Sequence, residues 1–255
     1  MTSSFRHSGK LGDIVYGLAA VGAFTDAQFF VNADGAHLSP ENAATILPLV
    51  RAQRYVSGAE LWTGQEFEYD LDGFRKFDVM FTNLADCHLR VVGLPTDCRN
   101  RARISVEIAT RFENRDIVFS RSVAHRGARN FWEMIYGAIG HRAFFLGAKA
   151  EHSAFLREVG ELPYVETMDL LEAAQMIARA RLVVGNQSCL LAIAEALKRP
   201  LVQEVHSHTP NCVFYRRDCY PVWSANQIPG VFNELGASRV LHEDAMRRDA
   251  WRRFG

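Results

Sequence analysis

The chain has 255 residues, of which 48% are hydrophobic, enough for one large α/β domain or two small ones with a sizeable core. Lysine and arginine number 29, as do aspartate and glutamate, so no net charge draws the chain toward nucleic acid or a membrane. The five cysteines form no CxxC pair, no apolar run reaches the roughly 20 residues of a membrane span, and the N-terminus lacks the apolar core of a signal peptide. We therefore expect a globular protein of the reducing cytoplasm.

A glycine-containing loop near the N-terminus leads into a predicted helix. After Gly9 and Gly12, apolar residues recur at helical spacing over residues 14–21, which places Asp13 at or beside a helix N-terminus. An aspartate there caps free backbone N–H groups and complements the helix dipole. It could also lie at the mouth of a cleft and take a proton from a substrate hydroxyl. The residues alone leave both interpretations open.

The rest of the N-terminal half alternates between strand-like and helix-like segments. Strands are predicted at residues 27–32 and within 59–69, and helices at residues 40–55 and 83–94. Asp70 and Asp72 form a DxD, a pattern that can hold a divalent metal, but the Gly73 that follows favours a solvated turn. His88 has no second ligand three or four residues away, which favours a packed or exposed histidine.

The middle of the chain shows where a second domain begins. Residues 103–110 alternate polar and apolar side chains like a strand, and residues 116–119 predict a short buried strand. The loop that follows, residues 120–130, contains glycine and three arginines: Arg121, Arg126 and Arg129. Each guanidinium can make a forked contact with a phosphate, so the loop suits a diphosphate. A solvated basic loop is the alternative interpretation.

From residue 116 onward, strands and helices alternate. Strands are predicted at residues 116–119, 142–147, 182–184 and 201–205, and helices at residues 131–140, 151–159, 169–180 and from about 188. This order predicts a parallel sheet with helices on both faces. Ligands of such sheets bind at the carboxyl ends of the strands.

Residues 182–200 predict a strand, a tight turn and a buried helix. The first backbone N–H groups of that helix, from about Ser188 to Leu190, lack intrahelical partners and suit an anion, most simply a phosphate. The segment contains neither GxGxxG nor GxxxxGK[ST]. An ordinary strand-to-helix turn is the alternative.

The C-terminal part of the chain offers weaker signals. Its HxHx3Cx6C pattern does not match the usual zinc spacings, so no metal site is predicted at His206, His208, Cys212 and Cys219. The tail from His242 predicts a basic amphipathic helix that closes the domain with its arginines in water.

Two segments together resemble a known family. HSGKLGDIVYGL near the start and DLLEAAQMIARARLVVGNQSCLLAIAEALKRP later are similar to the heptosyltransferase-like glycosyltransferases, glycosyltransferase family nine. The resemblance covers most of residues 5–20 and 117–205. It implies an α/β, GT-B-like fold, in which two small Rossmann-like domains face each other across a cleft. It also implies transfer of a sugar from a nucleotide diphosphate sugar with inversion.

The resemblance assigns roles to particular residues. It places the family's loop aspartate, the expected catalytic base, on Asp13. The family's GNDSGxxH turn falls on residues 185–192, where Gln187, Cys189 and Ala192 depart from the pattern and Ser188 keeps it. The donor-binding residues are then expected to be Arg121, Ser122, Arg129, Gly147, Glu151, Gln187, Ser188, Cys189 and Leu190, and the acceptor-side residues His7, Ser8 and Lys10.

We therefore predict an acceptor-side domain over residues 1–114, a donor domain over 115–238 and a C-terminal helix over 239–255 that packs back across the interface. The predicted reaction needs no metal or cofactor, takes a nucleotide diphosphate sugar as co-substrate, and modifies a glycan, a protein or modified DNA. One alternative is transfer to a hydroxymethylated DNA base, with a basic face formed by Arg216, Arg217, Arg247, Arg248, Arg252 and Arg253. Another is a nucleotide-binding module without catalysis.

Overall fold

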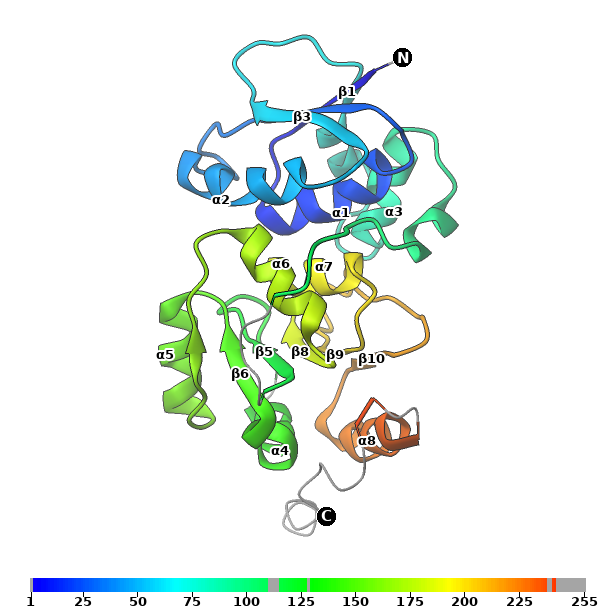
Figure 1. The fold of residues 1–255 in the computed structure, drawn as a ribbon. Helices are drawn as coiled ribbons and strands as arrows, with labels where there is room; N and C mark the ends of the chain where they lie inside the picture. The colour runs from blue at the N-terminus through cyan, green and yellow to red at the C-terminus, as the bar shows by residue number, and fades with distance from the viewer. Residues whose placement is uncertain (1, 110–114, 128, 238–239, 242–255) are drawn as a thin grey trace.

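The computed structural model describes residues 2–109, 115–127, 129–237 and 240–241, which form two α/β domains stacked one on the other (Figure 1). The first domain holds a four-stranded parallel sheet in the order β3-β2-β1-β4. Its strands are β1 (Ser3–His7), β2 (Ala27–Val31), β3 (Val56–Leu61) and β4 (Tyr69–Asp70). Its helices are α1 (Leu11–Val21), α2 (Pro40–Arg51) and α3 (Leu84–Val91), with the 3-10 turns η1 (Leu71–Lys76) and η2 (Thr96–Asn100).

Strand β1 is central in this sheet, yet the sequence pattern did not indicate it. Phe5 pairs in register with Phe29 of β2 on one side and with Tyr69 of β4 on the other. Phe5 and His7 are fully buried, whereas Ser4 and Arg6 on the opposite face are only partly covered. A five-residue strand that carries serine, arginine and histidine shows little apolar alternation, so only its two neighbours reveal it.

The second domain confirms the predicted parallel sheet. Its six strands lie in the order β10-β9-β8-β5-β6-β7, and every neighbouring pair is parallel. These strands are β5 (Ile117–Ser120), β6 (Ala143–Leu146), β7 (Tyr164–Val165), β8 (Leu182–Asn186), β9 (Leu201–Glu204) and β10 (Cys219–Val222). The helices are α4 (Arg129–Ile139), α5 (Lys149–Glu158), α6 (Leu170–Arg179), α7 (Cys189–Ala196) and α8 (Ile228–Ala237), with η3 (Gly140–Arg142) and η4 (Ala225–Gln227).

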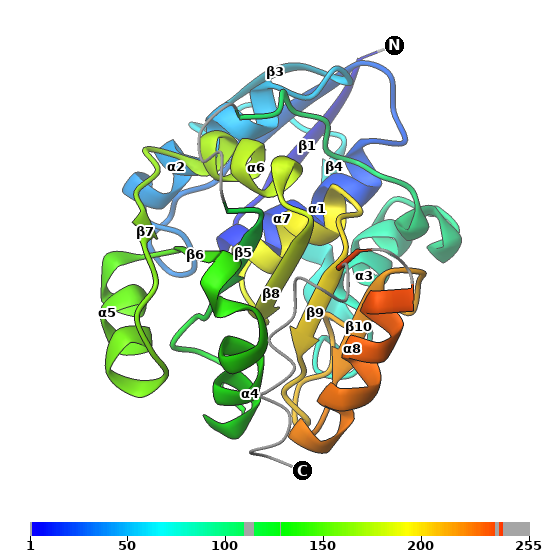
Figure 2. The same cartoon turned by 60° about the horizontal axis from the view of Figure 1, so that its bottom comes forward.

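Helices cover both faces of the second sheet (Figure 2). Side chains of α4, α5 and α8 share one apolar cluster with Phe119 of β5 and Val184 of β8. Helices α6 and α7 cover the other face, where they meet the first domain. The sequence pattern missed the edge strands β7 and β10 and helix α8. Of the predicted closing helix over 239–255, only residues 240–241 belong to the part of the chain that the structure describes.

The predicted strand at 103–110 is wrong over the described residues 103–109. This segment crosses from one domain to the other, and its hydrogen bonds go to partners outside any sheet. The backbone N–H of Arg103 donates to the carbonyl of Ala196, and the N–H of Ser105 donates to the side chain of Gln53. Of the apolar side chains of this segment, Ile104 is buried and Val106 packs against the core, whereas Ile108 is 65% exposed.

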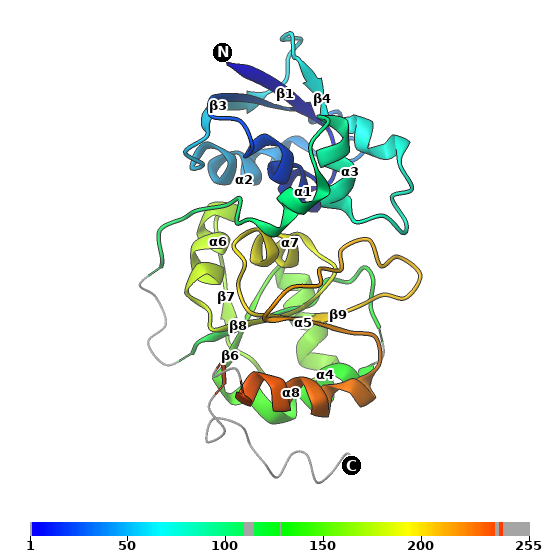
Figure 3. The ribbon, with the colours of Figure 1, turned by 90° about the vertical axis from the view of Figure 1, so that its right-hand side faces the viewer.

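The two domains meet through helices rather than through their sheets. Helix α1 packs against α7 and α2 packs against α6, so two helical layers lie between the two sheets (Figure 3). One continuous apolar core runs through both layers, from Phe5 in β1 to Val183 in β8. No helix in the described part of the chain is long and apolar enough to cross a membrane.

Candidate active site

A pocket of about 720 Å³ lies between the domains, where the carboxyl ends of both sheets meet. We call it the domain pocket. Such ends are where parallel sheets bind ligands, because loops and helix N-termini gather there. The first domain lines it with Lys10, Leu11, Gly12, Asp13, Tyr16, His37, Leu38, Asn42, Phe74, Arg75, Val79, Met80 and Leu84. The second domain lines it with Ser122, Ala124, His125, Gln187, Ser188, Cys189, Thr209, Asn211 and Cys212.

Two helix N-termini converge on this pocket. Gly12, in the first turn of α1, lies so close to α7 that a Cβ atom added there would stand 3.7 Å from the Cα of Cys189. The hydroxyl of Ser188 caps α7 by accepting the N–H of Leu191 at 3.2 Å. This leaves the N–H groups of Cys189 and Leu190 without intrahelical partners. Because the positive ends of both helix dipoles face the pocket, the pocket favours an anion.

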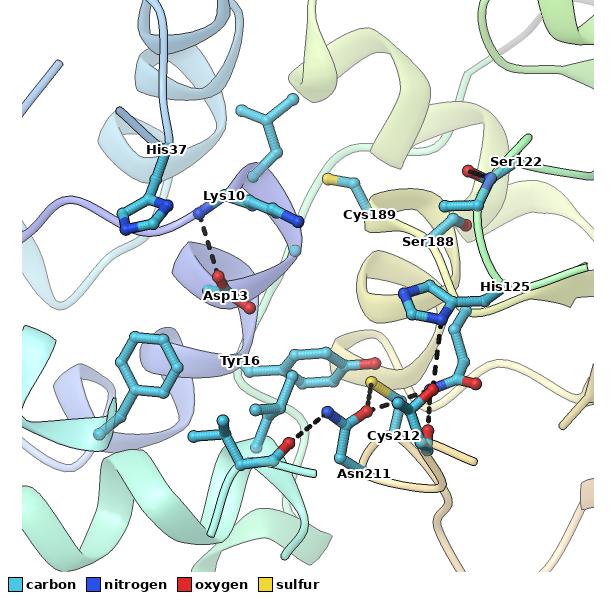
Figure 4. Close-up of a pocket in the computed structure, with 18 of the residues that line it drawn as sticks. Lys10, Asp13, Tyr16, His37, Ser122, His125, Ser188, Cys189, Asn211 and Cys212 are labelled. Atoms are coloured by element: carbon cyan, nitrogen blue, oxygen red, sulfur yellow. Dashed lines mark hydrogen bonds between the residues drawn. The ribbon is translucent and has the colours of Figure 1, made fainter. Parts of the chain in front are cut away.

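Asp13 lies at the lip of the pocket, on the first turn of α1 (Figure 4). One of its carboxylate oxygens accepts the backbone N–H of Lys10 at 3.0 Å, so it caps the helix as the sequence suggested. A side chain at Gly9 would collide with Asp13, because its Cβ would stand 2.7 Å from the Cβ of Asp13. Burial raises the pKa of Asp13, although the Lys10 N–H and the Arg75 charge oppose the shift. A carboxylate in this state accepts a proton more readily than an ordinary aspartate.

The second-domain wall of the pocket is held by two amide side chains. Asn186 at the end of β8 is fully buried and accepts the N–H of Ser122 at 2.8 Å. Its NH₂ group donates to the carbonyls of Ser122, at 3.0 Å, and Ala124, at 2.8 Å. Gln187 donates to the carbonyl of Thr209 at 2.5 Å and accepts the N–H of His206 at 3.2 Å. These amides fix the loops that follow β5 and β9.

Gln187 stands where the related turn carries an aspartate, and its contacts explain why an amide fits. An amide donates and accepts at once, whereas a carboxylate could not donate to the Thr209 carbonyl. Gln187 and Asn211 also hydrogen-bond each other, at 3.0 Å. The departure from the family turn therefore supports the loop that carries Asn211 and Cys212 into the pocket.

Several pocket residues were not foreseen from the sequence. Tyr16 is buried, and its hydroxyl points across the pocket toward the thiol of Cys212 (Figure 4). Because Tyr16 follows Asp13 by three residues on a helix, helical spacing could have placed it on the same face. His125 adopts a left-handed φ of 53° and lies within 3.2 Å of the Thr209 hydroxyl. Its position depends on the loop clamp by Asn186, which no local pattern reveals.

The lining side chains differ in charge. Lys10 and Arg75 are the basic ones, and Arg75 also pairs with Asp72 at 2.7 Å. Burial lowers the pKa of His125, and the nearby His206 and Lys10 charges lower it further. His125 is therefore neutral at pH 7 and offers a hydrogen bond rather than a charge.

Two of the three arginines predicted to bind the diphosphate, Arg121 and Arg126, do not line the domain pocket. Arg121 is only 4% exposed, and its guanidinium donates to Glu158 at 2.5 Å and lies over the ring of Trp132. Arg126 binds the other oxygen of Glu158 at 2.9 Å. The side chain of Arg129 lies outside the described residues. The acidic partner on α5 therefore draws Arg121 and Arg126 away from the pocket.

Gly147 and Glu151 lie at the same sheet edge but outside the pocket lining. Gly147 follows β6 with a φ of 152°, a region that favours glycine. The carboxylate of Glu151 accepts the N–H of Ala148 at 3.0 Å and caps α5. Leu190 turns its side chain into the core, so only its backbone can serve the pocket. Ser122, Gln187, Ser188 and Cys189 line the pocket.

His7 and Ser8 lie beneath the pocket, whereas Lys10 lines it. His7 accepts the N–H of Gly9 at 2.8 Å through Nδ1, and its Nε2 lies 2.9 Å from Nε2 of His88. His88 uses Nδ1 to donate to the carbonyl of Leu84 at 2.7 Å, so its Nε2 must accept from His7. Burial lowers the pKa of His7 far below its usual value and that of His88 to about 4. This neutral pair supports the loop that carries Asp13.

The DxD carboxylates serve structural ion pairs. Asp70 caps η1 and pairs with Arg6 at 2.9 Å. Asp72 accepts the N–H of Ser8 at 2.9 Å and its hydroxyl at 2.6 Å. Burial opposes ionisation of Asp72, but the Ser8 hydrogen bonds outweigh it, with help from His7 and Arg75, and hold its pKa below the usual value. Within the described residues, no three His, Cys, Asp or Glu side chains gather in a way that could hold a metal ion.

Known proteins share this architecture. Residues 141–211 match the model of glycosyltransferase family 9 (heptosyltransferase), a segment that includes β8 and the start of α7. No curated protein sequence matches the chain. The E. coli heptosyltransferase WaaC, solved with ADP-2-deoxy-2-fluoro heptose, is 11% identical with a TM-score of 0.60, over 92% of this chain and 99% of that one.

Two further structures agree. The dodecameric, iron-containing glycosyltransferase TibC from enterotoxigenic E. coli H10407 is 14% identical with a TM-score of 0.63, over 93% of this chain and 76% of that one. The ADP-heptose lps heptosyltransferase II of E. coli is 12% identical with a TM-score of 0.56, over 94% of this chain and 100% of that one. The GT-B-like fold predicted from the sequence is thereby confirmed. Residues 141–211 are thus similar to glycosyltransferase family 9, and the described chain shares the fold of these heptosyltransferases.

Proposed function

We propose that the protein transfers a sugar with inversion from a nucleoside diphosphate sugar to an acceptor hydroxyl, with Asp13 as the base. The observation that supports this most is the meeting of Asp13 with the N-termini of α1 and α7 in one pocket. A carboxylate with a raised pKa suits proton removal, and helix N-termini suit a diphosphate. WaaC was solved with an ADP-heptose analogue, which makes ADP-heptose the first donor to test.

In the proposed step, Asp13 takes the proton of the acceptor hydroxyl as its oxygen attacks the anomeric carbon. The new bond forms on the face opposite the old one, so the configuration inverts while the bond to the diphosphate oxygen breaks. The electron pair stays on the departing diphosphate. Its charge meets the free N–H groups of Cys189 and Leu190 and the ammonium of Lys10. Tyr16 supplies a hydroxyl that faces the thiol of Cys212, a weak hydrogen-bond partner that a substrate could replace.

The donor is held mainly by backbone groups in this proposal. Arg121 and Arg126 form ion pairs with Glu158. The positive ends of two helices and Lys10 therefore bind the diphosphate in place of the arginine loop. We propose that no metal takes part, since these groups already offset the phosphate charge.

Nucleotide sugar turnover tests the proposal directly. The chain is incubated with ADP-heptose, and separately with UDP- and GDP-hexoses, and release of the nucleoside diphosphate is followed with and without oligosaccharide acceptors. Release by the parent protein that Asp13→Asn abolishes would support catalysis by Asp13. Binding of the diphosphate without release from any donor would instead favour a nucleotide-binding module.

The acceptor class remains to be tested in the same assay. A DNA acceptor would bind to a basic face formed by arginines. Of these, the structure describes only Arg216 and Arg217. Arg216 binds Glu195 at 2.8 Å, and Arg217 is largely exposed beside Asp218. A mobility shift with hydroxymethylated duplex DNA at two salt concentrations would reveal DNA binding. We propose that the acceptor is a glycan, because of the surface beside the pocket that is described below.

A further inference from the structure

The exposed aromatic side chains of the described chain gather at one place. Three aromatic residues have more than a third of their surface exposed: Phe81 at 67%, Tyr215 at 75% and Trp223 at 42%. All three line a single groove of about 370 Å³, together with Thr82, Asn83, Asp86, Arg99, Pro210 and Val213. We call it the aromatic groove. Large apolar side chains that cluster in a concave surface mark a binding site more often than scattered ones do.

The aromatic groove lies on the other side of one wall of the domain pocket. That wall consists of residues 79–84 from the first domain and 209–213 from the second, and both segments line both cavities. The N–H of Leu84 donates to the carbonyl of Asn211 at 2.9 Å, which joins the two segments. Asn83 donates to the carbonyl of Val213 at 2.8 Å and joins them again. A ligand that extends out of the pocket over this wall would therefore reach the groove.

One polar group in the groove lacks a partner. Asp86 on α3 is only 8% exposed, and its Oδ1 has no hydrogen bond among the described residues, while its Oδ2 binds Arg99. Burial raises the pKa of Asp86, although Arg99 and Arg90 oppose the shift. A buried carboxylate oxygen without a donor costs free energy, and a ligand hydroxyl would supply that donor once the Asp86 side chain turns toward the groove that it lines.

We infer that the aromatic groove binds a sugar unit of the acceptor, stacked on the exposed aromatic rings and held through a hydroxyl by Oδ1 of Asp86. A sugar ring carries C–H bonds on its faces and hydroxyls at its edge, so it matches a site that has aromatic faces and one free carboxylate oxygen. The negative face of an aromatic ring attracts the weakly positive C–H groups. The inference rests on the proposed function, because the groove would extend the acceptor path from the pocket that contains Asp13.

Other occupants fit the groove less well. A phospholipid headgroup would bring negative charge toward Asp86, whose free oxygen needs a donor. A folded partner or a second copy would bury about 800 Å² on each side of a stable interface, whereas this concave groove has the volume of a small-molecule site. Binding energy from such a remote sugar would position the attacked hydroxyl over Asp13.

The test uses the full chain and defined sugars. Saturation-transfer NMR is recorded with the methyl glycosides of glucose, galactose, mannose and N-acetylglucosamine, and with maltotetraose and chitotetraose. We expect transfer to ring C–H protons of at least one probe. Tyr215→Ala and Trp223→Ala should each weaken its binding about fivefold to tenfold, as expected for loss of one stacking face. Asp86→Asn should weaken it about tenfold through the lost charged acceptor.

Matched variants separate stacking from unrelated effects. Tyr215→Phe keeps the ring and should bind like the parent. Met168→Ala removes another exposed apolar side chain, at the end of the sheet beside β7 rather than β10, and should also bind like the parent. ADP binding, measured by calorimetry, should stay unchanged in all of these variants because none lines the domain pocket.

The outcomes distinguish this inference from the proposed function. No saturation transfer to any probe, or transfer that Tyr215→Ala and Trp223→Ala leave intact, would overturn the groove assignment even if ADP binds. Suppose instead that no sugar binds. If Tyr215→Ala and Trp223→Ala then abolish binding to phosphatidylglycerol vesicles, the groove belongs to a lipid. If they abolish a dimer seen in sedimentation, it belongs to a second copy. Sugar binding at the groove by a chain that releases no nucleoside diphosphate would contradict the proposed function alone.

Discussion

The two walls of the domain pocket are built in different ways. The first-domain wall offers side-chain chemistry: the Asp13 carboxylate, the Tyr16 hydroxyl and the Lys10 ammonium. The second-domain wall offers backbone N–H groups at the start of α7, and its polar side chains Asn186 and Gln187 hold loops in place. A wall made of backbone groups tolerates changes of side chain as long as its shape is kept, whereas a side-chain wall does not. Substitutions on the two walls should therefore impair the protein in different ways, through lost side-chain chemistry on the first-domain wall and through lost shape on the second-domain wall.

The largest expected effect is on the first-domain wall, at Asp13. Asp13→Asn keeps an oxygen that accepts the Lys10 N–H and caps α1 about as well, but it loses the proton acceptor. We expect turnover to fall by about 10² to 10⁴, the usual contribution of a general base, with unchanged diphosphate affinity. Steady-state rates and calorimetry measure the two quantities.

The pH dependence provides the control for Asp13. Its raised pKa means that the unfolded chain holds the ionised carboxylate more readily, so ionised Asp13 lowers stability above the unfolded pKa. Asp13→Asn should therefore keep or raise the Tm at pH 7. The acid limb of kcat/KM in the parent should lie above about 3.9, the ordinary value for aspartate, and rise with pH. An Asn variant that keeps both the rate and this limb would leave Asp13 as a cap alone.

The next effect is on the second-domain wall, at Asn186. Asn186→Ala removes the hydrogen bonds that hold the loop of Ser122 and Ala124, and it leaves buried backbone groups unpaired. We expect a loss of about 2 to 4 kcal/mol in the free energy of unfolding and weaker ADP binding. Urea unfolding and calorimetry give both values. Unchanged ADP affinity in the folded variant would show that the loop does not shape the donor site.

A smaller effect is expected at Tyr16. Tyr16→Phe deletes a buried hydroxyl that faces the thiol of Cys212, a weak hydrogen-bond partner, so the free energy of unfolding should change by less than about 1 kcal/mol. If the hydroxyl donates to the bound substrates, kcat/KM should drop about tenfold. Rates for the two proteins at equal donor concentration decide between a donor and a packing group. Equal rates would remove Tyr16 from the side-chain chemistry of the wall.

Arg121 tests the opposite expectation on the second domain. Arg121→Ala should cost about 1 to 3 kcal/mol of stability, because the guanidinium packs on Trp132 and binds Glu158, which is left with Arg126. ADP affinity should change by less than about twofold, since other groups line the pocket. Arg126→Ala, on the more exposed partner, is the matched control. A loss of ADP affinity without loss of stability would restore Arg121 to the donor site.

The smallest expected effect is that of a chelator. The helix N-termini and Lys10 supply positive potential, and Asp70 and Asp72 are already paired with Arg6. Activity in the donor assay should therefore survive EDTA. Loss in EDTA that manganese or magnesium restores would require a metal in the pocket.

Some features of this protein could be predicted from the sequence alone. The alternation after residue 116 determines a parallel sheet, because β5, β6, β8 and β9 are each buried on both faces. The position of Asp13 follows from local glycines and helical spacing, and the start of α7 from the turn before it. These are local signals, carried by residues close together in the chain. The tertiary contacts of the same segments have no comparable local pattern in the sequence.

The tertiary structure decided the rest because the contacts involved are remote in sequence. Strand β1 exists because β2 and β4 pair with it. Residues 103–109 are a linker because their backbone N–H groups bond to α6, α7 and the side chain of Gln53. The sequence suggested that Arg121 could bind phosphate, but in the fold its guanidinium binds Glu158, 37 residues later in the chain. Burial and pairing are properties of the folded neighbourhood, so they determine which charged side chains remain available to a ligand.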